Sequence, residues 1–449
     1  MKRINSKYLH TGTRWLTDAS LILNAEGRIE KVCPQHEADH LPHRYEEEWE
    51  APLVIPGCVN THSHAFQVML RPTTGQPQHF HDWVERFLYP LVETLNEEQI
   101  YASALLAFSE MLRGGMTTVG EFFYVHNLAD GTSSRQRHAQ AVIEAARDVG
   151  LRIVLIRALY DQASKPGQQR FYESADQALS QTAELAKHYS RIDGVSVLPA
   201  PHSLHGASRA LIEGAAELAQ QLKSPWHIHL AEQQSDIAFA QERYGHRPLQ
   251  CLEAWGILSE ATTLVHGIWL DEDDRALMAR RKAALAYNPQ TNMALGDGIA
   301  RIPDLLSRGV RIALGTDANL TSELFGEARL TEYLQRVQQL QMGQIPDVRV
   351  LFRMLNVNGG PILAQSVGQL EPGYYADVLL LDAEHPSLWP ALDAPQPETA
   401  LLNQLIFSMV PQEAIQTVIV GGREVVQQGE TLLLDRQAIR RRLAQARQA

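Results

Sequence analysis

The sequence predicts an α/β protein, a (β/α)8 TIM barrel with a small β-sandwich domain built from both ends of the chain. Three observations support this fold class. The chain has 449 residues, which suits one barrel-sized unit and a smaller one. Its middle part alternates short apolar runs with longer amphipathic stretches. Both ends carry short strand-like runs separated by turn residues.

The barrel is expected at residues 55–365. Buried parallel strands are short and nearly all apolar, and amphipathic segments such as 104–112 and 141–146 lie between the apolar runs. Eight strands alternating with helices is the number that closes a (β/α)8 barrel. The candidate strands are residues 53–59, 117–120, 152–159, 195–199, 227–230, 263–266, 284–288 and 311–315.

The small domain is expected to be discontinuous, from residues 1–54 and 366–449. Strand-like pieces occur at 19–23 and 28–32 near the start of the chain, and again at 376–382 and 417–426 near its end. The two ends of a chain often lie close together, so these pieces can form one unit.

Composition excludes several classes of protein. Hydrophobic residues are 45% and charged residues 20%, as in an ordinary globular protein. The net charge of -12 disfavours nucleic acid and anionic membrane surfaces, and no apolar run reaches the roughly 18 residues of a membrane span. The three cysteines form no C-x-x-C pair, which argues against disulfides and thiolate zinc sites. We expect a cytoplasmic protein that acts on a small molecule.

Polar residues that follow the apolar runs indicate an active site. In a (β/α)8 barrel the site lies at the carboxyl ends of the strands. His62 and His64 are two apart, so on a strand they share one face. The residues collected in this way are His62, His64, His229, Glu232, His266 and Asp317.

Four of these residues form a plausible metal site. Three imidazoles, from His62, His64 and His229, with the carboxylate of Asp317 suit one borderline divalent ion, with zinc as the first choice and ferrous iron as the alternative. His227 precedes the end of its strand and is interpreted as structural or as a support for the ligands.

These motifs, in this order, resemble the amidohydrolase superfamily over nearly the full chain. Binuclear members of that superfamily bridge two metals through a modified lysine after the fourth strand, and residues 197–202 contain no lysine. The resemblance therefore implies a single metal ion. It rests on Pro56-Gly57-x-x-Asn60-x-His62-x-His64, His227-x-His229-x-x-Glu232, Val265-His266-Gly267, Gly315-Thr316-Asp317 and Gly368-x-Leu370-x-x-Gly373-x-x-Ala376-Asp377.

Within the superfamily, the chain is similar to the mononuclear deaminases of cytosine, guanine, thiomethyladenosine and formiminoglutamate. The resemblance implies hydrolysis at a C=N carbon with release of ammonia. Asp317, with His266 beside it, would take a proton from water, and Glu232 would deliver protons to the departing nitrogen. Relatives of this kind are commonly homodimers, which we also expect here.

Several local strings resemble N-formimino-L-glutamate deiminase, an iminohydrolase of histidine catabolism. They include His62-Ser63-His64-Ala65-Phe66-Gln67 and His202-Ser203-Leu204. The resemblance implies that Gln67, Tyr124 and His202 bind the substrate. That family also uses two arginines, but His205 stands at the position of one, and Arg86 is displaced from the position of the other. Because a dicarboxylate prefers bidentate arginine partners, both departures weaken this substrate assignment.

Two alternatives stay open. The string Asn288-Pro289-Gln290-Thr291-Asn292 resembles the nucleoside and triazine members, so the substrate could be a heterocyclic amidine: an aminopurine, a pterin, or a thiomethyladenosine or adenosylhomocysteine type of nucleoside. A stacking platform of Phe or Trp in the pocket would favour this alternative. The other is an inactive structural homologue, which is disfavoured because every expected ligand is present.

Overall fold

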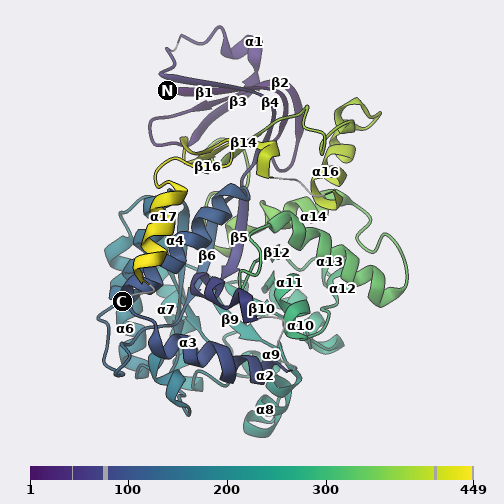
Figure 1. The fold of residues 1–449 in the computed structure, drawn as a ribbon. Helices are drawn as coiled ribbons and strands as arrows, with labels where there is room; N and C mark the ends of the chain where they lie inside the picture. The colour runs from purple at the N-terminus through teal and green to yellow at the C-terminus, as the bar shows by residue number, and fades with distance from the viewer. Residues whose placement is uncertain (43, 74–78, 409–411, 447–449) are drawn as a thin grey trace.

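The computed structural model describes residues 1–446 except 43, 74–78 and 409–411. Figure 1 shows two parts, a barrel surrounded by helices and a smaller β domain that covers one end of it. Both ends of the chain, in purple and yellow, contribute to the smaller part. This is the predicted fold class.

Eight parallel strands form the barrel, as expected, and they are arranged as two four-stranded sheets. The first sheet has the order β5-β6-β7-β8 and the second has the order β12-β11-β10-β9. Nearly every residue in these strands is buried. The strands are β5 (Cys58–Ser63), β6 (Met116–Phe123), β7 (Arg152–Leu159), β8 (Val195–Pro201), β9 (Trp226–Leu230), β10 (Thr262–His266), β11 (Ala284–Tyr287) and β12 (Ile312–Leu314).

Two seams close the barrel, and both lie at residues of the predicted site. Between β5 and β12, the backbone N–H of Asp317 donates to the carbonyl of His62 at 2.9 Å, and the N–H of His64 donates to the carbonyl of Asp317 at 2.8 Å. Between β8 and β9, the N–H of His229 donates to the carbonyl of His202 at 3.0 Å. Gly315 permits the first seam, because a Cβ there would lie 2.8 Å from Cβ of His62.

Helices cover the outside of the barrel (Figure 1). Caps fix several of their starts: Asn96 and Gln99 form a reciprocal capping box at α4, and Asp271 caps α10. The covering helices are α4 (Glu97–Arg113), α5 (Arg137–Val149), α6 (Ala175–Tyr189), α7 (Arg209–Leu222), α8 (Gln234–Tyr244), α9 (Pro248–Ala254), α10 (Glu272–Arg281), α11 (Pro289–Leu295), α12 (Ile302–Ser307), α13 (Leu324–Gln339), α14 (Val348–Leu355) and α15 (Gly359–Ile362).

Shorter elements and peripheral helices complete the chain. A run of short helices after β5 leads across the mouth of the barrel, and α17 lies against α4, where Nε2 of Gln99 donates to the carbonyl of Ala446 at 3.0 Å. These elements are α1 (Gln35–Ala38), η1 (Ala65–Thr73), α2 (Phe80–Trp83), the π-helix η2 (Val84–Leu88), α3 (Tyr89–Thr94), η3 (Pro166–Arg170), η4 (Ala391–Asp393), α16 (Pro397–Phe407), η5 (Gln412–Ala414) and α17 (Arg436–Ala446).

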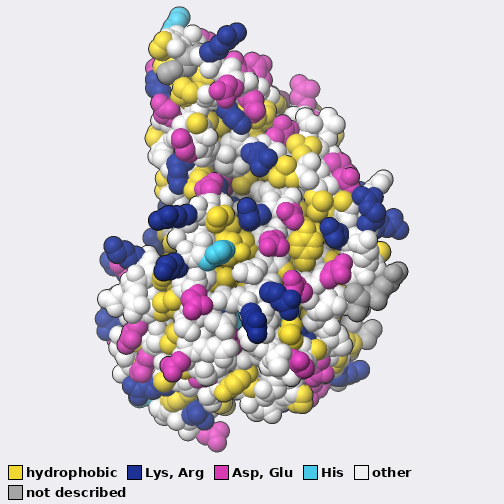
Figure 2. Space-filling model, turned by 90° about the vertical axis from the view of Figure 1, so that its left-hand side faces the viewer, with side chains coloured by type: hydrophobic (Ala, Val, Ile, Leu, Met, Phe, Trp, Pro, Cys, Tyr) yellow, Lys and Arg dark blue, Asp and Glu magenta, His cyan; other side chains and the backbone are white. Residues whose placement is uncertain are grey.

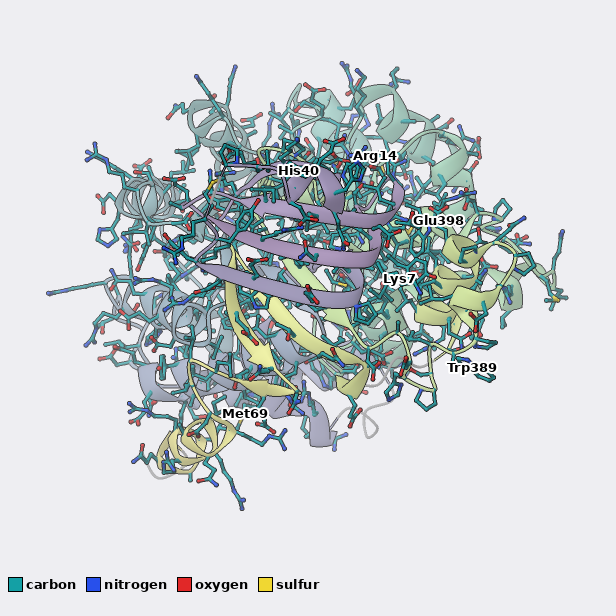
Figure 3. The ribbon with its side chains drawn as sticks, turned by 90° about the horizontal axis from the view of Figure 1, so that it is seen from above. Lys7, Arg14, His40, Met69, Trp389 and Glu398 are labelled. Atoms are coloured by element: carbon teal, nitrogen blue, oxygen red, sulfur yellow. The ribbon has the colours of Figure 1, made fainter. Side chains whose placement is uncertain are left out.

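The small β domain is one eight-stranded sheet of order β16-β15-β14-β13-β4-β1-β2-β3. In Figure 3 its purple strands lie directly beside its yellow strands. The two ends of the chain meet where β4 pairs antiparallel with β13, and β4 pairs parallel with β1 on its other side. The strands are β1 (Lys2–His10), β2 (Trp15–Leu23), β3 (Ile29–Pro34), β4 (Glu47–Pro56), β13 (Val378–Leu381), β14 (Ile415–Val420), β15 (Arg423–Gln427) and β16 (Glu430–Thr431).

Alternation along the central strands explains how this sheet holds two cores. Val54 and Leu380 belong to a small apolar core inside the β domain. Their neighbours Leu53 and Leu379 belong to the large core that continues into the barrel. Since successive side chains on a strand point to opposite faces, one sheet seals its own core and also covers the end of the barrel.

The chain passes from one sheet to the other at Gly57. A single strand was expected over residues 53–59, but β4 ends at Pro56 in the β domain and β5 begins at Cys58 in the barrel. A Cβ on Gly57 would lie 2.3 Å from Oγ1 of Thr117, so the backbone passes too close to β6 for any larger residue. Because β4 and β5 are both buried at this point, the apolar run continues across Gly57. Hydrophobic periodicity alone therefore does not show that one strand ends and another begins there.

The surface carries charges of both signs. On the face shown in Figure 2, Lys and Arg side chains are interspersed with Asp and Glu side chains. Among the described residues, no helix is long and apolar enough to cross a membrane.

Candidate active site

Three histidines converge where the two half-sheets meet. His62 and His64 come from the end of β5 and His229 from β9. Nε2 of His62 lies 3.3 Å from Nε2 of His64 and 3.2 Å from Nε2 of His229. All three residues are buried. The structure therefore brings together the three imidazoles that the sequence predicts as ligands.

Backbone carbonyls set the protonation of two of these rings. Nδ1 of His64 donates to the carbonyl of Phe122 at 2.8 Å, and Nδ1 of His229 donates to the carbonyl of His202 at 3.0 Å. A neutral imidazole carries only one proton, so Nε2 of both rings presents a lone pair. Lone pairs that face one another in a buried space need a cation between them.

Asp317 supplies the fourth donor. Its Oδ1 lies 3.3 Å from Nε2 of His64 and 3.6 Å from Nε2 of His62. Burial raises the pKa of Asp317 to about 8, with the nearby Asp297 adding to the effect. Burial also lowers the pKa of His64 to about 4, against the hydrogen bond to Phe122. A bound divalent cation would favour the ionised carboxylate, and the neutral imidazoles are already in the form that binds metal.

The donor set fits a tetrahedral zinc ion. Zinc binds imidazole nitrogen at about 2.0–2.1 Å, which places neighbouring donors of a tetrahedron about 3.3–3.4 Å apart. The nitrogen separations of 3.2 and 3.3 Å and the nitrogen to oxygen separation of 3.3 Å match this spacing. With Asp317 as the fourth donor the tetrahedron would be complete, so a water molecule would enter from the cavity as an additional ligand.

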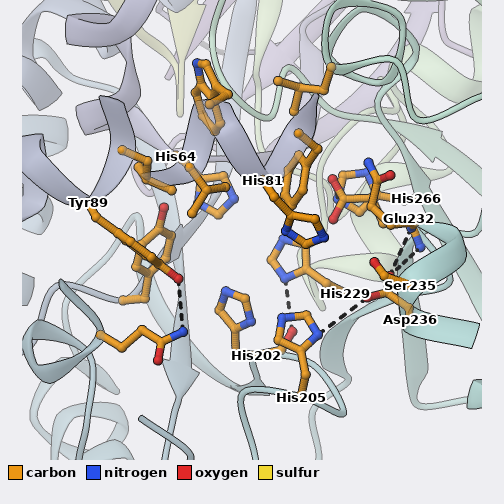
Figure 4. A pocket seen from close by; sticks show the side chains of 18 of the residues that line it. His64, His81, Tyr89, His202, His205, His229, Glu232, Ser235, Asp236 and His266 are labelled. Atoms are coloured by element: carbon orange, nitrogen blue, oxygen red, sulfur yellow. Dashed lines mark hydrogen bonds and ion pairs between the residues drawn. The ribbon is translucent and has the colours of Figure 1, made fainter. Parts of the chain in front are cut away.

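Glu232 and His266 lie beside the ligands. Figure 4 shows both on one side of the pocket, with His229 between them and His202. Nε2 of His266 is 3.6 Å from Oε1 of Glu232 and 3.9 Å from Oδ2 of Asp317. Burial, followed by the charges of the nearby aspartates, raises the pKa of Glu232 well above its ordinary value. The raised pKa favours the protonated carboxyl, which can act as an acid.

Backbone conformation contributes to this convergence. Ala231, His266 and Asp317 have φ values of 54°, 74° and 51°, in the left-handed region that residues with a Cβ rarely adopt. Each such residue costs about 1 kcal/mol or more. The three lie at the ends of β9, β10 and β12, where the left-handed turn redirects the chain at the rim of the barrel.

A cavity of about 350 Å³ opens beside the ligands and reaches Glu232 and Asp317. Its walls are largely aromatic, and Trp83 and Phe171 are among the buried rings. The segment α2-η2-α3 forms one wall, and the loop around η3 forms another. The aromatic lining residues are Phe80, Trp83, Tyr89, Tyr124, Tyr160, Phe171 and Phe239.

Four of the five predicted substrate-binding residues line this cavity: Gln67, Tyr124, His202 and His205. Nε2 of Gln67 donates to the hydroxyl of Tyr124 at 2.9 Å. Nδ1 of His205 lies 3.5 Å from Oδ1 of Asp236, an ion pair drawn as a dashed line in Figure 4.

Arg86 does not line the cavity. It lies on the exposed side of the π-helix η2, and its guanidinium is 5.5 Å from the ring centroid of its neighbour Phe87. Trp83 and Val84 line the cavity and Arg86 does not, so the described lining gives no support to the prediction that Arg86 contacts substrate.

His227 lies on the same strand as His229 but contacts a different part of the protein. Its Nε2 donates to the carbonyl of Ile362 in α15 at 3.1 Å, away from the three ligand rings. It therefore connects β9 to the helix that covers the barrel.

Sequence reasoning missed several residues of the site. Trp83 and Phe171 stand far from the metal-binding motifs in sequence, and no motif indicates them. Asn292 ends the string Asn-Pro-x-x-Asn and Asp297 follows it in Leu295-Gly296-Asp297-Gly298, but neither residue had an assigned role. Asn292 contacts His266 directly, with Nδ2 at 2.9 Å from Nδ1.

The fold and the site define a metal-dependent hydrolase: a (β/α)8 barrel with three imidazoles, a carboxylate and a buried acid at the carboxyl ends of its strands. The chain belongs to the Amidohydrolase family, whose signature matches residues 53–425. This membership, together with its deaminase relatives, makes the protein a hydrolase of carbon–nitrogen bonds of the deaminase class.

Curated relatives cover most of the chain. A 5-methylthioadenosine/S-adenosylhomocysteine deaminase of Desulfitobacterium hafniense is 31% identical over 85% of this chain and 83% of its own. The enzyme of that name from Halothermothrix orenii is 27% identical over 98% of this chain and 96% of its own. A 5'-deoxyadenosine deaminase of Methanopyrus kandleri is 24% identical over 96% and 94%.

Solved structures share the fold. An adenosine deaminase of Xanthomonas campestris with bound zinc superposes with a TM-score of 0.87 at 24% identity, over 100% of this chain and 98% of its own. An atrazine chlorohydrolase of Arthrobacter aurescens in complex with zinc gives 0.86 at 22% identity, over 99% and 100%.

Proposed function

We propose that the protein is a zinc-dependent hydrolytic deaminase of an adenine ring, with a 5'-modified adenosine as its substrate. The main support is the cavity beside the proposed metal ligands, because several aromatic side chains line it. Aromatic walls bind a flat heterocycle by stacking, and the volume of about 350 Å³ lies in the range of small-molecule sites. The names of the curated relatives support the same class of substrate.

The cavity is poorly suited to N-formimino-L-glutamate. That substrate brings two carboxylates, which need strong positive partners. Among the described lining residues there is no arginine, and the ammonium of Lys165 is already paired with the carboxylate of Glu85. Asp236 and Glu232 add acidic groups to the walls. The relatives and the lining both favour the heterocyclic alternative over the formiminoglutamate assignment and its place in histidine catabolism.

The residues of the site divide the work of the reaction. His62, His64, His229 and Asp317 would hold the ion, which when bound acts as a Lewis acid and makes water a nucleophile near neutral pH. The carboxylate of Asp317 accepts the proton that water loses as its oxygen adds to the amino-bearing ring carbon. Glu232 donates a proton to the adjacent ring nitrogen. The proton held by Asp317 then passes to the amino group, which leaves as ammonia, and the proton of the new hydroxyl returns to Glu232 as the ring becomes the corresponding oxo form.

The test is ammonia release by the zinc-loaded protein. The panel contains 5'-methylthioadenosine, S-adenosylhomocysteine, 5'-deoxyadenosine, adenosine, a pterin and N-formimino-L-glutamate, with Glu232→Gln as the matched inactive control. We expect turnover of the adenosines, accompanied by a change in the purine absorption spectrum. Turnover of formiminoglutamate without turnover of any adenosine would overturn the proposal, and elemental analysis of the purified protein distinguishes zinc from ferrous iron.

Two further expectations from the sequence stay predictions. A homodimer is tested by light scattering on the eluted protein, and the cytoplasmic location by fractionation of cells that express it.

A further inference from the structure

We infer that Asn292 and Asp297 are positioning residues that hold the proton of His266 on Nε2, so that His266 acts as a hydrogen-bond donor to the reacting centre. The assignment of the tautomer stands on geometry alone, and its effect on turnover rests on the proposed function. Neither residue has an assigned role in the site as described so far.

Asn292 connects the other two residues. Its Nδ2 lies 2.9 Å from Nδ1 of His266 and 2.8 Å from Oδ2 of Asp297. An amide nitrogen carries two protons and accepts none, so both contacts require an acceptor on the far side. All three side chains are buried, with at most 1% of their surface exposed. Bulk solvent therefore does not reach these contacts.

Asp297 fixes which way the amide of Asn292 faces. Its Oδ1 accepts a hydrogen bond from Nε2 of Gln233, so its two oxygens face two amide nitrogens. Rotating the amide of Asn292 by half a turn would place Oδ1 against a carboxylate oxygen. In the observed orientation, Oδ1 of Asn292 is buried and has no hydrogen-bond partner among the described residues.

Asp297 is itself held in place. Its backbone N–H donates to the carbonyl of Asn292 at 2.9 Å, and its own carbonyl accepts from Nε1 of Trp269 at 3.0 Å. The positive φ of Gly296 and Gly298 on either side allows the tight loop that returns Asp297 to the end of α11. The carboxylate thus approaches Asn292 from a fixed backbone.

The consequence falls on His266. A ring nitrogen that accepts a hydrogen bond carries no proton, so the proton of His266 is on Nε2. That atom faces Oε1 of Glu232 at 3.6 Å and Oδ2 of Asp317 at 3.9 Å. His266 therefore cannot take a proton from water at this atom, which leaves Asp317 as the acceptor of that proton. It can donate to a carboxylate or to oxygen that gains negative charge as water adds.

The test exchanges the two side chains in the double variant Asn292→Asp/Asp297→Asn. Net charge is conserved, but a carboxylate now faces Nδ1 of His266, and the proton should move to Nδ1. The readout is a ¹⁵N spectrum of the zinc-loaded, substrate-free protein with labelled histidine. Comparison with His266→Gln identifies the signals of His266, and Asp304→Asn is the matched control on α12.

We expect the Nε2-protonated pattern in the wild type and in Asp304→Asn, and the Nδ1-protonated pattern in the double variant. The turnover number of the double variant should fall about tenfold or more, with zinc content and KM nearly unchanged. A wild-type signal of the Nδ1-protonated form, or a double variant with an unchanged pattern, would overturn the inference. If the double variant does not fold, the wild-type spectrum still decides.

The spectrum also separates the two proposals. If no adenosine is turned over but the wild type shows the Nε2-protonated pattern, the proposed function fails and the tautomer assignment stands. If adenosines are turned over and the pattern is the reverse, the assignment fails alone.

Discussion

The carbonyl oxygen of His202 accepts two hydrogen bonds from His229, one from the backbone N–H and one from Nδ1, both at 3.0 Å. The first bond joins β8 to β9 across a seam of the barrel. The second orients the imidazole and leaves the lone pair of Nε2 facing His62. One carbonyl therefore links closure of the barrel to preparation of a metal ligand.

His229 and His227 provide a matched pair of variants. They are two apart on the same strand, but only His229 faces the other ligands, whereas Nε2 of His227 donates to the carbonyl of Ile362. We expect His229→Asn to lower zinc affinity by at least about tenfold, and His227→Asn to retain zinc. Elemental analysis and competition with a chelator measure both. Equal zinc loss in the two variants would contradict the ligand assignment.

Removal of the metal should destabilise the protein. A ligand that binds only the folded state at 1,000 times its dissociation constant stabilises it by about 4 kcal/mol. For a chain of this length, we expect the melting temperature to fall by roughly 5 °C after dialysis against a chelator. Calorimetry before and after dialysis measures the change, and added zinc should reverse it. A melting temperature indifferent to zinc would argue against a site at the closure of the barrel.

Glu232→Gln should separate binding from turnover. The amide keeps the shape of the side chain but has no acidic proton to transfer, so turnover should fall by a factor of about 10² to 10⁴. Zinc content should be unchanged, because the proposed ligands are the three imidazoles that converge and the carboxylate of Asp317, and Glu232 is not one of them. Steady-state kinetics and elemental analysis on the same preparation test this. Full activity in a zinc-loaded variant would exclude Glu232 as the acid.

Trp83→Ala tests the aromatic wall. Trp83 is 4% exposed and lines the cavity, whereas Trp389 is 64% exposed and does not, so Trp389→Ala is the control. Base stacking on an aromatic ring contributes about 1–3 kcal/mol. We expect kcat/KM for the adenosine substrate to fall about tenfold or more in Trp83→Ala only. An equal effect of the two substitutions, with the fold intact by circular dichroism, would remove Trp83 from the binding site.

The buried imidazole of His227 predicts a pH dependence of stability. Burial lowers its pKa from 6.5 to about 4. Between these values the unfolded chain binds a proton that the folded protein does not bind. The stabilisation is complete above pH 6.5 and is lost as the pH falls toward 4, at about 1.4 kcal/mol per pH unit.

Urea unfolding of wild type and His227→Asn between pH 7 and 4.5 isolates this contribution. The variant should be the less stable protein at pH 7, and the difference should narrow as the pH falls. A difference that stays constant over this range would show that His227 titrates alike in the folded and unfolded states.

The barrel and the metal ligands could be predicted because they follow local rules. Short apolar strands followed by His or Asp recur along the chain, and the barrel places all of those strand ends at one rim. The convergence of the four proposed ligands could be predicted without knowing how the loops fold. These ligands are His62, His64, His229 and Asp317. The break at Gly57 could not be predicted, because strands buried on both sides read as one apolar run.

The walls of the cavity could not be predicted for a different reason. Trp83 and Phe171 stand on segments that cross the mouth of the barrel, and their distance from the ligands depends on how those segments fold. Trp83 ends α2 and lines the cavity, whereas Arg86 is exposed in the π-helix η2 that follows, and no hydrophobic period signals such a π-helical turn. The resemblance to N-formimino-L-glutamate deiminase rested on short strings near the ligands, and such strings do not report which side chains the crossing segments bring into the cavity.

The two seams divide the active site between two pieces of chain. The half-sheet from β5 to β8 carries His62 and His64, and the half-sheet from β9 to β12 leads to His229 and Asp317. If the chain were cut in the connection between β8 and β9, each fragment would keep half of the donors and neither could close a coordination sphere. Zinc binding would then require association of the two fragments. Zinc could therefore control the reassembly of a split form of this protein, and binding of zinc would measure that reassembly.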